Sequence, residues 1–292
     1  MYRLPLELRK KLAIIFSSVG AILFIFGFLL YRSASSSKYY KVESFDYAYQ
    51  TADVKNIEIS ASNGDILVKN GDFLTVTAND VVKGRFSSKL EGNTLTINYN
   101  LGFVDGNIGK YTGKPDSKIT ITLPSKLYEQ ISIINGDGSF SLRNLTCNSA
   151  NIVTGDGDSE FYDFSVNQKC EIKRGFGKLS FVNSCFDNTI ISNGVGELLF
   201  RKCSLTNLRY STTWGKLRML LCTLKGENSI ETGFGKSSIS LIGNTDNYGF
   251  EFTKGHGSIT VNDKDCSAFD KSGKEVFTRF VGGFGDSKIT IS

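Results

Sequence analysis

Histidine, tryptophan, methionine and proline are all scarce in this chain of 292 residues, which has 1 His, 1 Trp, 2 Met and 3 Pro. A single histidine argues against a zinc site and against a histidine-based catalytic triad, because both usually require that side chain. The chain nevertheless contains 40% apolar residues and 30 Gly, which excludes a disordered protein and a collagen-like one. Its length suffices for one or two domains with a proper core.

An excess of positive charge is missing from most of the chain, although the formal net charge is +5. Five of the 34 Lys and Arg, and one of the 29 Asp and Glu, lie at or before Arg32, which leaves 29 basic and 28 acidic residues beyond it. A nearly neutral domain lacks the field that attracts a phosphate backbone. We therefore expect no nucleic-acid partner.

One long apolar run occurs in the chain, at residues 12–31, with the sequence LAIIFSSVGAILFIFGFLLY. These twenty uncharged residues would span about 30 Å as a helix, the thickness of a bilayer's hydrocarbon core. Arg3, Arg9, Lys10 and Lys11 precede the run, and this bias favours a cytoplasmic N-terminus. We predict a cytoplasmic basic segment at 1–11, a single-pass transmembrane signal anchor at 12–31, and an extracytoplasmic remainder.

Two alternatives to a retained anchor remain open from the sequence. A cleaved signal peptide would have a small-residue site, for which Ser33-Ala34-Ser35 is a candidate, but its apolar region is usually only about 7 to 15 residues long. A buried core helix would also be apolar. Residues 32–52 are rich first in Ser and then in Tyr, and we expect them to form a stalk or linker.

A Gly-x-Gly turn recurs from Gly136 to Gly285, separated by short segments of alternating apolar and polar residues. The second glycines, with Gly215 of Thr-Trp-Gly filling one gap, follow one another at 19, 20, 19, 19, 20, 22 and 28 residues. Alternation with a period of two is typical of half-buried strands, and a fixed interval indicates a stacked repeat. Apolar residues also recur four positions after the second glycine and five before it, as at Phe161, Phe181, Ile172 and Ile191.

These patterns predict an all-β protein with a β-solenoid at 118–292, in which two-strand coils of 19–20 residues stack to join their apolar rows. About eight coils would reach about 38 Å at about 4.8 Å per coil. Residues 53–117 have less regular spacing and are expected to form an irregular N-terminal β segment, with a loop at 101–114. A β-sandwich built of hairpins is the alternative fold.

The run NIEISASNGDILV at 56–68, the run ITITLPSKLYEQISIINGDG at 119–138 and the Gly-x-Gly units that follow resemble the bacterial "putative adhesin" family of β-strand-repeat envelope domains. The resemblance covers most of residues 53–292. It implies a β-repeat fold in the cell envelope and attachment to a surface. No binding residue carries over from it, because the shared motifs are structural.

Six cysteines occur in this predicted exported domain, where disulfides are common. The spacing from the glycines places five of them, all except Cys170, at the looser turn of successive coils, so we expect one stack of buried thiols. Disulfides between adjacent coils and, less favoured, a metal site remain as alternatives, although Cys-x-x-Cys pairs are absent. The cysteines are Cys147, Cys170, Cys185, Cys203, Cys222 and Cys266.

Two aspartates, Asp137 and Asp156, lie between the glycines of the first two units. Calcium repeats have a nine-residue period, and here the period is about twice that, so we expect turn-stabilising aspartates rather than a calcium column. The same pair would lie about one coil apart, a separation that a retaining glycosidase uses. Without neighbouring catalytic groups in the sequence, an enzyme is the weaker hypothesis, and we expect no cofactor.

Large side chains replace the aspartate in the later Gly-x-Gly units. If they point outward they form a strip suited to stacking on sugars or to capturing an envelope partner, and if they point inward they close the core. The sequence slightly favours the inward orientation. The candidate binding ridge comprises Phe176, Val195, Trp214, Phe234, His256 and Phe284.

The expected function is that of a non-enzymatic binding or scaffolding domain, displayed outside the membrane by its single-pass anchor. An envelope polysaccharide or a membrane-protein partner fits this expectation. A sensor subunit for envelope stress and a wall-polysaccharide enzyme are the alternatives.

Overall fold

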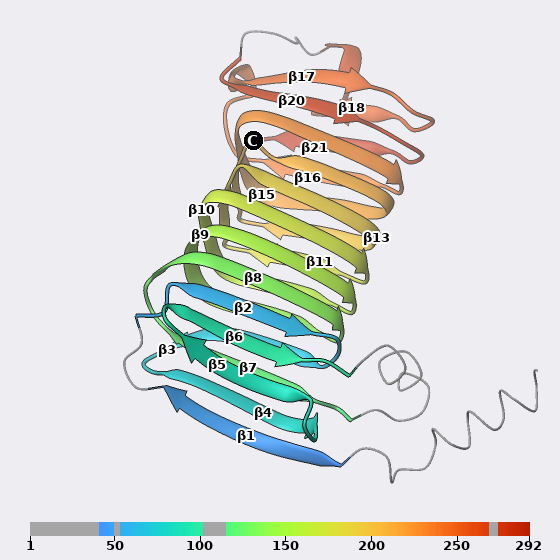
Figure 1. Ribbon diagram of the computed structural model, residues 1–292. Coiled ribbons are helices and arrows are strands. Elements are labelled where there is room, and N and C mark those ends of the chain that lie inside the picture. The colour runs from blue at the N-terminus through green and yellow to red at the C-terminus, as the bar shows by residue number, and fades with distance from the viewer. Residues whose placement is uncertain (1–40, 50–52, 102–114, 269–273) are drawn as a thin grey trace, which may run out of the picture.

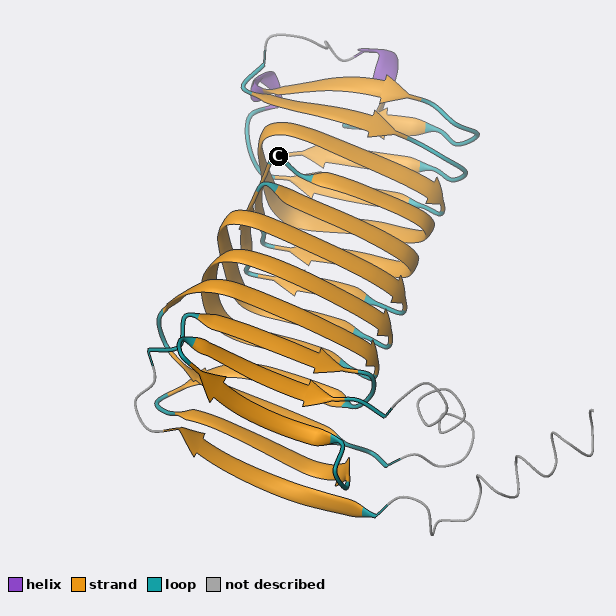
Figure 2. Ribbon diagram, viewed as in Figure 1, coloured by secondary structure: helices purple, strands orange, loops and turns teal. Residues whose placement is uncertain are grey.

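The computed structural model describes residues 41–49, 53–101, 115–268 and 274–292. The predicted anchor at 12–31 and nearly all of the predicted loop at 101–114 lie outside the described residues. Within the described ranges, no helix has the length and apolarity that a membrane span requires. Strands account for nearly all of the regular structure, and the only helices found in these ranges are two short 3-10 turns, η1 (Thr245–Asn247) and η2 (Cys266–Ala268) (Figure 2).

The strands form one continuous sheet that winds into a column of stacked coils (Figure 1). The first seven strands are β1 (Val42–Tyr49), β2 (Asn56–Ala61), β3 (Asp65–Gly71), β4 (Leu74–Val82), β5 (Phe86–Glu91), β6 (Thr94–Tyr99) and β7 (Lys118–Pro124). The central strands are β8 (Leu127–Asp137), β9 (Phe140–Asp156), β10 (Ser159–Phe176), β11 (Leu179–Val182), β12 (Cys185–Asp187), β13 (Thr189–Arg201), β14 (Ser204–Thr206), β15 (Arg209–Phe234) and β16 (Ser237–Leu241). The last are β17 (Tyr248–Thr253), β18 (Ile259–Val261), β19 (Lys264–Asp265), β20 (Val276–Val281) and β21 (Ser287–Ile291).

The central coils pair in parallel and in register, each with the coil 19 or 20 residues further along the chain. Phe161 of β10 lies opposite Leu142 of β9 and Phe181 of β11, and Phe200 lies opposite Phe181 and Met219. A hairpin sandwich would instead pair neighbouring strands antiparallel. The observed register is that of the predicted solenoid-like repeat, and it confirms the all-β prediction.

The predicted apolar rows form the core of this column. Leu142, Phe161, Phe181, Phe200 and Met219 are all fully buried. The rings of Phe161, Phe181 and Phe200 stack along the axis, with centroids 4.7 Å and 5.0 Å apart. Because each coil alone leaves these side chains in water, stacking the coils is what buries them.

The coils at the C-terminal end do not follow the order of the sequence. β20 lies between β15 and β17, and β21 lies between β16 and β18. The chain therefore leaves β16, forms the outermost coil with β17 and β18, and returns to insert its last coil beneath it (Figure 1). The 28-residue interval before Gly285 reflects this return, whereas the sequence indicated only a decorated or capping coil.

The N-terminal end is interleaved in the same way. β2 lies between β6 and β8, and β3 lies between β7 and β9, all in parallel. β4 then pairs antiparallel with β7 and with β1, while β5 pairs antiparallel with β6. The described residues between 53 and 117 thus belong to the same stack as the later coils. Within the predicted stalk at 32–52, residues 42–49 form strand β1 instead.

Candidate functional site

The side chains of the candidate binding ridge point outward, which corrects the slight preference for an inward orientation. Their exposed fractions are 58% for Phe176, 39% for Val195, 59% for Trp214, 42% for Phe234 and 48% for Phe284. His256 is exposed as well. The chain turns a corner of the coil at these glycines, and the strand residues on either side take the inward positions.

Successive coils align these side chains into one ridge along the column, which we call the Gly-x-Gly ridge. In register, Asp137 lies opposite Asp156, Asp156 opposite Phe176, Phe176 opposite Val195, and Val195 opposite Trp214. The ridge then continues as a stack of rings. Their centroids are 4.8 Å apart for Trp214 and Phe234, 4.6 Å for Phe234 and Phe284, and 4.4 Å for Phe284 and His256.

A glycine is required at Gly196 beneath the ridge because the coils approach so closely there. Its φ is +134°, and an added Cβ would collide with the carbonyl oxygen of Gly177 on the preceding coil. L-residues rarely adopt this backbone conformation, so both conformation and space exclude a side chain. The ridge residues are therefore held on rigid, closely stacked turns.

Buried polar side chains hold these turns from inside the column. Asn135 Nδ2 donates to Gly138 O at 3.2 Å, and Asn193 Nδ2 donates to Gly196 O at 3.4 Å. Arg174 takes the equivalent position on its own coil, three residues before the second glycine, and is only 5% exposed. Its Nη2 donates to Gly157 O at 2.7 Å and to Phe176 O at 2.8 Å. Burial lowers the pKa of Arg174, and the charges of Asp158 and Asp156 oppose that shift. Arg174 thus fixes the turn that carries Phe176.

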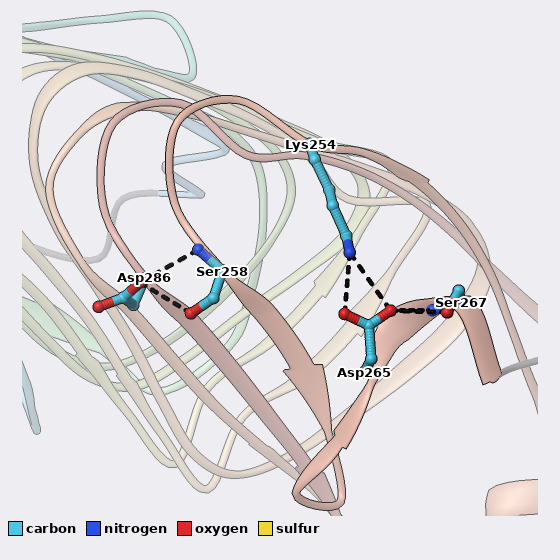
Figure 3. Close-up of polar contacts among 5 residues, drawn as sticks. All are labelled: Lys254, Ser258, Asp265, Ser267 and Asp286. Atoms are coloured by element: carbon cyan, nitrogen blue, oxygen red, sulfur yellow. Dashed lines mark hydrogen bonds and ion pairs between the residues drawn. The ribbon is translucent and has the colours of Figure 1, made fainter.

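Aspartates just after a turn glycine tie neighbouring coils together on the outside. Asp286 Oδ1 accepts hydrogen bonds from Ser258 N at 3.1 Å and from Ser258 Oγ at 2.7 Å (Figure 3). Asp65 makes the same pair of bonds with Ser139, at 2.8 Å and 2.7 Å. Asp158 Oδ1 accepts from the backbone N–H of Lys178 at 2.8 Å. These acids stabilise turns, as expected for aspartates beside glycines.

A shallow groove of about 620 Å³ runs beside the ridge across four coils. Its lining comprises three consecutive residues on each coil, at 153–155, 173–175, 192–194 and 211–213, and the next residue on each coil is a ridge residue. Gly155, Gly175 and Gly194 leave the space open, whereas Thr213 occupies the equivalent place on the fourth coil. Sequence reasoning missed this groove, although its outward residues recur four positions before the second glycine.

Asp137 and Asp156 lie on neighbouring coils in the ridge column, as the sequence suggested. Neither belongs to the lining of the groove, and that lining contains no carboxylate. Among the residues that the structure describes, no group of His, Cys, Asp and Glu side chains is placed to hold a metal ion.

The cysteines do not form the single stack that their spacing suggested. All six are free thiols, five of them buried, and Cys185 is exposed. Cys203 and Cys222 lie on adjacent coils, because the residues after them, Ser204 and Thr223, are paired in register. Cys185 itself pairs with Ser204, one position further along. Burial raises the pKa of Cys147 to about 12, as expected for inert structural thiols.

Several solved structures are similar to this chain at low sequence identity. A cell adhesion protein from Clostridium sporogenes, described as putative, is 13% identical, with a TM-score of 0.37, over 86% of this chain and 100% of that one. A putative adhesin from Bacteroides fragilis is 15% identical, with a TM-score of 0.49, over 87% and 98% of the two chains. A putative lipid binding protein from Parabacteroides distasonis is 14% identical, with a TM-score of 0.41, over 85% and 98%.

The curated proteins include no match to this chain. A protein-family model, Toastrack DUF4097, matches residues 54–278, which is most of the chain and nearly all of the stacked coils. The match confirms the family resemblance noted from the sequence. By its stacked β repeat and by this match, the chain belongs to the Toastrack DUF4097 family.

Proposed function

We propose that this protein is a non-enzymatic binding domain of the bacterial cell envelope, held at the membrane by an N-terminal anchor at residues 12–31. Its binding surface is the Gly-x-Gly ridge together with the groove beside it. Residues 33–292 lie outside the cytoplasm, and residues 1–11 lie inside.

The observation that carries this proposal is the outward projection of large apolar side chains from one edge of consecutive coils. Phe176, Trp214, Phe234 and Phe284 are each more than two-fifths exposed, although the strands beside them bury their apolar residues. A continuous exposed apolar strip is uncommon on a folded domain and marks an interaction surface. Rigid stacked turns hold the strip in one conformation, which lowers the entropic cost of binding.

The wall-polysaccharide enzyme is the weaker hypothesis for a geometric reason. A retaining glycosidase places two carboxyl groups on either side of the bond that it cleaves. Here Asp137 and Asp156 lie in the ridge column, whereas the groove that could receive a polymer has no carboxylate in its lining.

Retention on a total envelope fraction, containing both wall and membrane with their proteins, tests the binding function. The full chain in detergent should be retained, and the ridge double variant Phe176→Ala with Trp214→Ala should be retained much less while keeping the thermal midpoint nearly unchanged. Phe73→Ala, which removes an exposed phenylalanine outside the ridge and the groove, is the matched control and should bind like the wild type. Equal retention of the wild type and a well-folded ridge variant would contradict the proposed surface.

Protease accessibility tests the location. The excess of Lys and Arg before Leu12 motivates the orientation. Protease added to intact spheroplasts should therefore digest the β domain and leave a short fragment that contains the anchor. If the domain survives until the cells are lysed, the orientation is wrong.

A further inference from the structure

The two halves of the Gly-x-Gly ridge expose different parts of their rings. From Trp214 to His256 the rings stack nearly parallel, with interplanar angles of 29°, 6° and 22° at successive pairs. Phe234 and Phe284 therefore have both faces covered by neighbouring rings. Phe234 and Phe284 are 42% and 48% exposed, and because their faces are covered by rings, their edges are the parts left open to solvent. A sugar ring packs its C–H face onto an aromatic face, so Phe234 and Phe284 offer no platform for it.

Phe176 differs from the stacked rings. Its neighbours in the ridge column are Asp156 on one side and Val195 on the other. No other aromatic ring within the described part of the chain lies against it, and it is 58% exposed. Arg174 holds its turn from inside by donating a hydrogen bond from Nη2 to the carbonyl oxygen of Phe176 at 2.8 Å. Phe176 is thus a rigidly held aromatic side chain whose ring faces are not covered by other rings.

The groove lies directly beside this residue and runs parallel to the column axis. Three steps between its four coils give it a length of about 14 Å at about 4.8 Å per coil. Lys173, Ser192 and Ser211 line one side with an amino group and two hydroxyls, and the glycine column forms a floor without side chains. Lys173 Nζ is 2.8 Å from Glu171 Oε1, which holds this amino group close to its own coil. The groove is open at the surface, so it suits a stretch of a longer molecule.

We propose that Phe176 and this groove bind a linear glycan, with one sugar ring on the face of Phe176 and hydroxyls of the chain on Ser192, Ser211 and Lys173. The proposal rests on the proposed function, because it names the ligand of the same surface. Apolar ring faces beside hydrogen-bonding groups match the amphipathic surface of a sugar, which has C–H groups on its faces and hydroxyls at its rim. The covered rings of Phe234 and Phe284 border this site and also link two of the interleaved C-terminal coils.

Binding of the full chain in detergent to protein-free peptidoglycan tests this assignment, with a hexamer of β-1,4-linked N-acetylglucosamine as the soluble competitor. Phe176→Ala should weaken binding at least tenfold, and Phe176→Trp should restore it. Ser211→Gln, which fills the groove from an exposed position, should also weaken binding. Phe73→Ala is the matched control, because it removes an exposed phenylalanine that lies outside the ridge and the groove, and it should change binding by less than twofold.

The outcomes separate this inference from the proposed function. Retention on the total envelope without binding to protein-free peptidoglycan or the hexamer would show a partner other than a glycan, and would overturn the inference alone. Loss of binding in Phe234→Ala but not in Phe176→Ala, with both variants folded, would place the site on the ring stack and would also overturn it. Absence of retention on the total envelope would overturn both.

Discussion

Replacing Phe200 by alanine tests the assignment of the core most directly. Phe200 is fully buried, and its ring stacks on Phe181 with centroids 5.0 Å and planes 14° apart. Substitution of a buried Phe by Ala usually costs about 3 to 5 kcal/mol, and the cost is larger where neighbours cannot fill the cavity. Phe181 and Met219, on the adjacent coils, are each held by their own strand pairing. We therefore expect a loss near 4 kcal/mol, within the range of about 3 to 5.

Urea unfolding of the full chain, followed by the far-ultraviolet circular dichroism of its strands, measures this loss. Lys216→Ala is the control, because Lys216 is exposed on a neighbouring coil and its removal should leave the unfolding midpoint unchanged. A loss below about 1 kcal/mol for Phe200→Ala, or equal losses for the two variants, would refute the inward and outward assignments.

Three further predictions concern the turns, the thiols and the C-terminal coils. Gly196→Ala should cost about 2 to 3 kcal/mol in thermal or urea unfolding, since it strains a backbone at φ +134° and collides with the preceding coil. Gly84→Ala, where φ is +70° and no atom lies within 4 Å of the added Cβ, should cost only about 1 kcal/mol. A thiol reagent such as dithionitrobenzoate should react rapidly with Cys185 alone in the native protein and with all six cysteines after denaturation without reductant; a count below six would reveal a disulfide. Hydrogen bonds from Ser267 and Lys254 lower the pKa of Asp265, and hydrogen bonds from Ser258 lower that of Asp286 (Figure 3). Because these folded-state pKa values lie below the unfolded value of about 3.9, the stabilisation is present above about pH 4 and is lost as the pH falls below it. The thermal midpoint should fall with pH in that window, and less steeply in the double variant Asp265→Asn with Asp286→Asn; parallel curves would contradict the assignment.

The sequence by itself determined the class of fold and most of the interior. Alternation with a period of two specifies strands with one buried face, and the 19–20-residue interval specifies which residues of different coils are equivalent. Both are local properties of the chain, so Phe161, Phe181 and Phe200 could be assigned to one buried row without coordinates. The glycine positions also marked the corners of the coils, because the close approach of coils at a corner such as Gly196 admits no side chain.

Only the tertiary structure decided the order of the terminal coils, the direction of the ridge and the existence of the groove. Coils of similar length and pattern can pair with several neighbours, so the insertion of β20 and β21 beneath β17 and β18 depends on long-range packing. The direction of Trp214 and Phe234 depends on the backbone path around each corner, which a repeating Gly-x-Gly motif leaves open. The groove arises from residues that are far apart in the sequence, and it becomes continuous only when four coils are stacked in register.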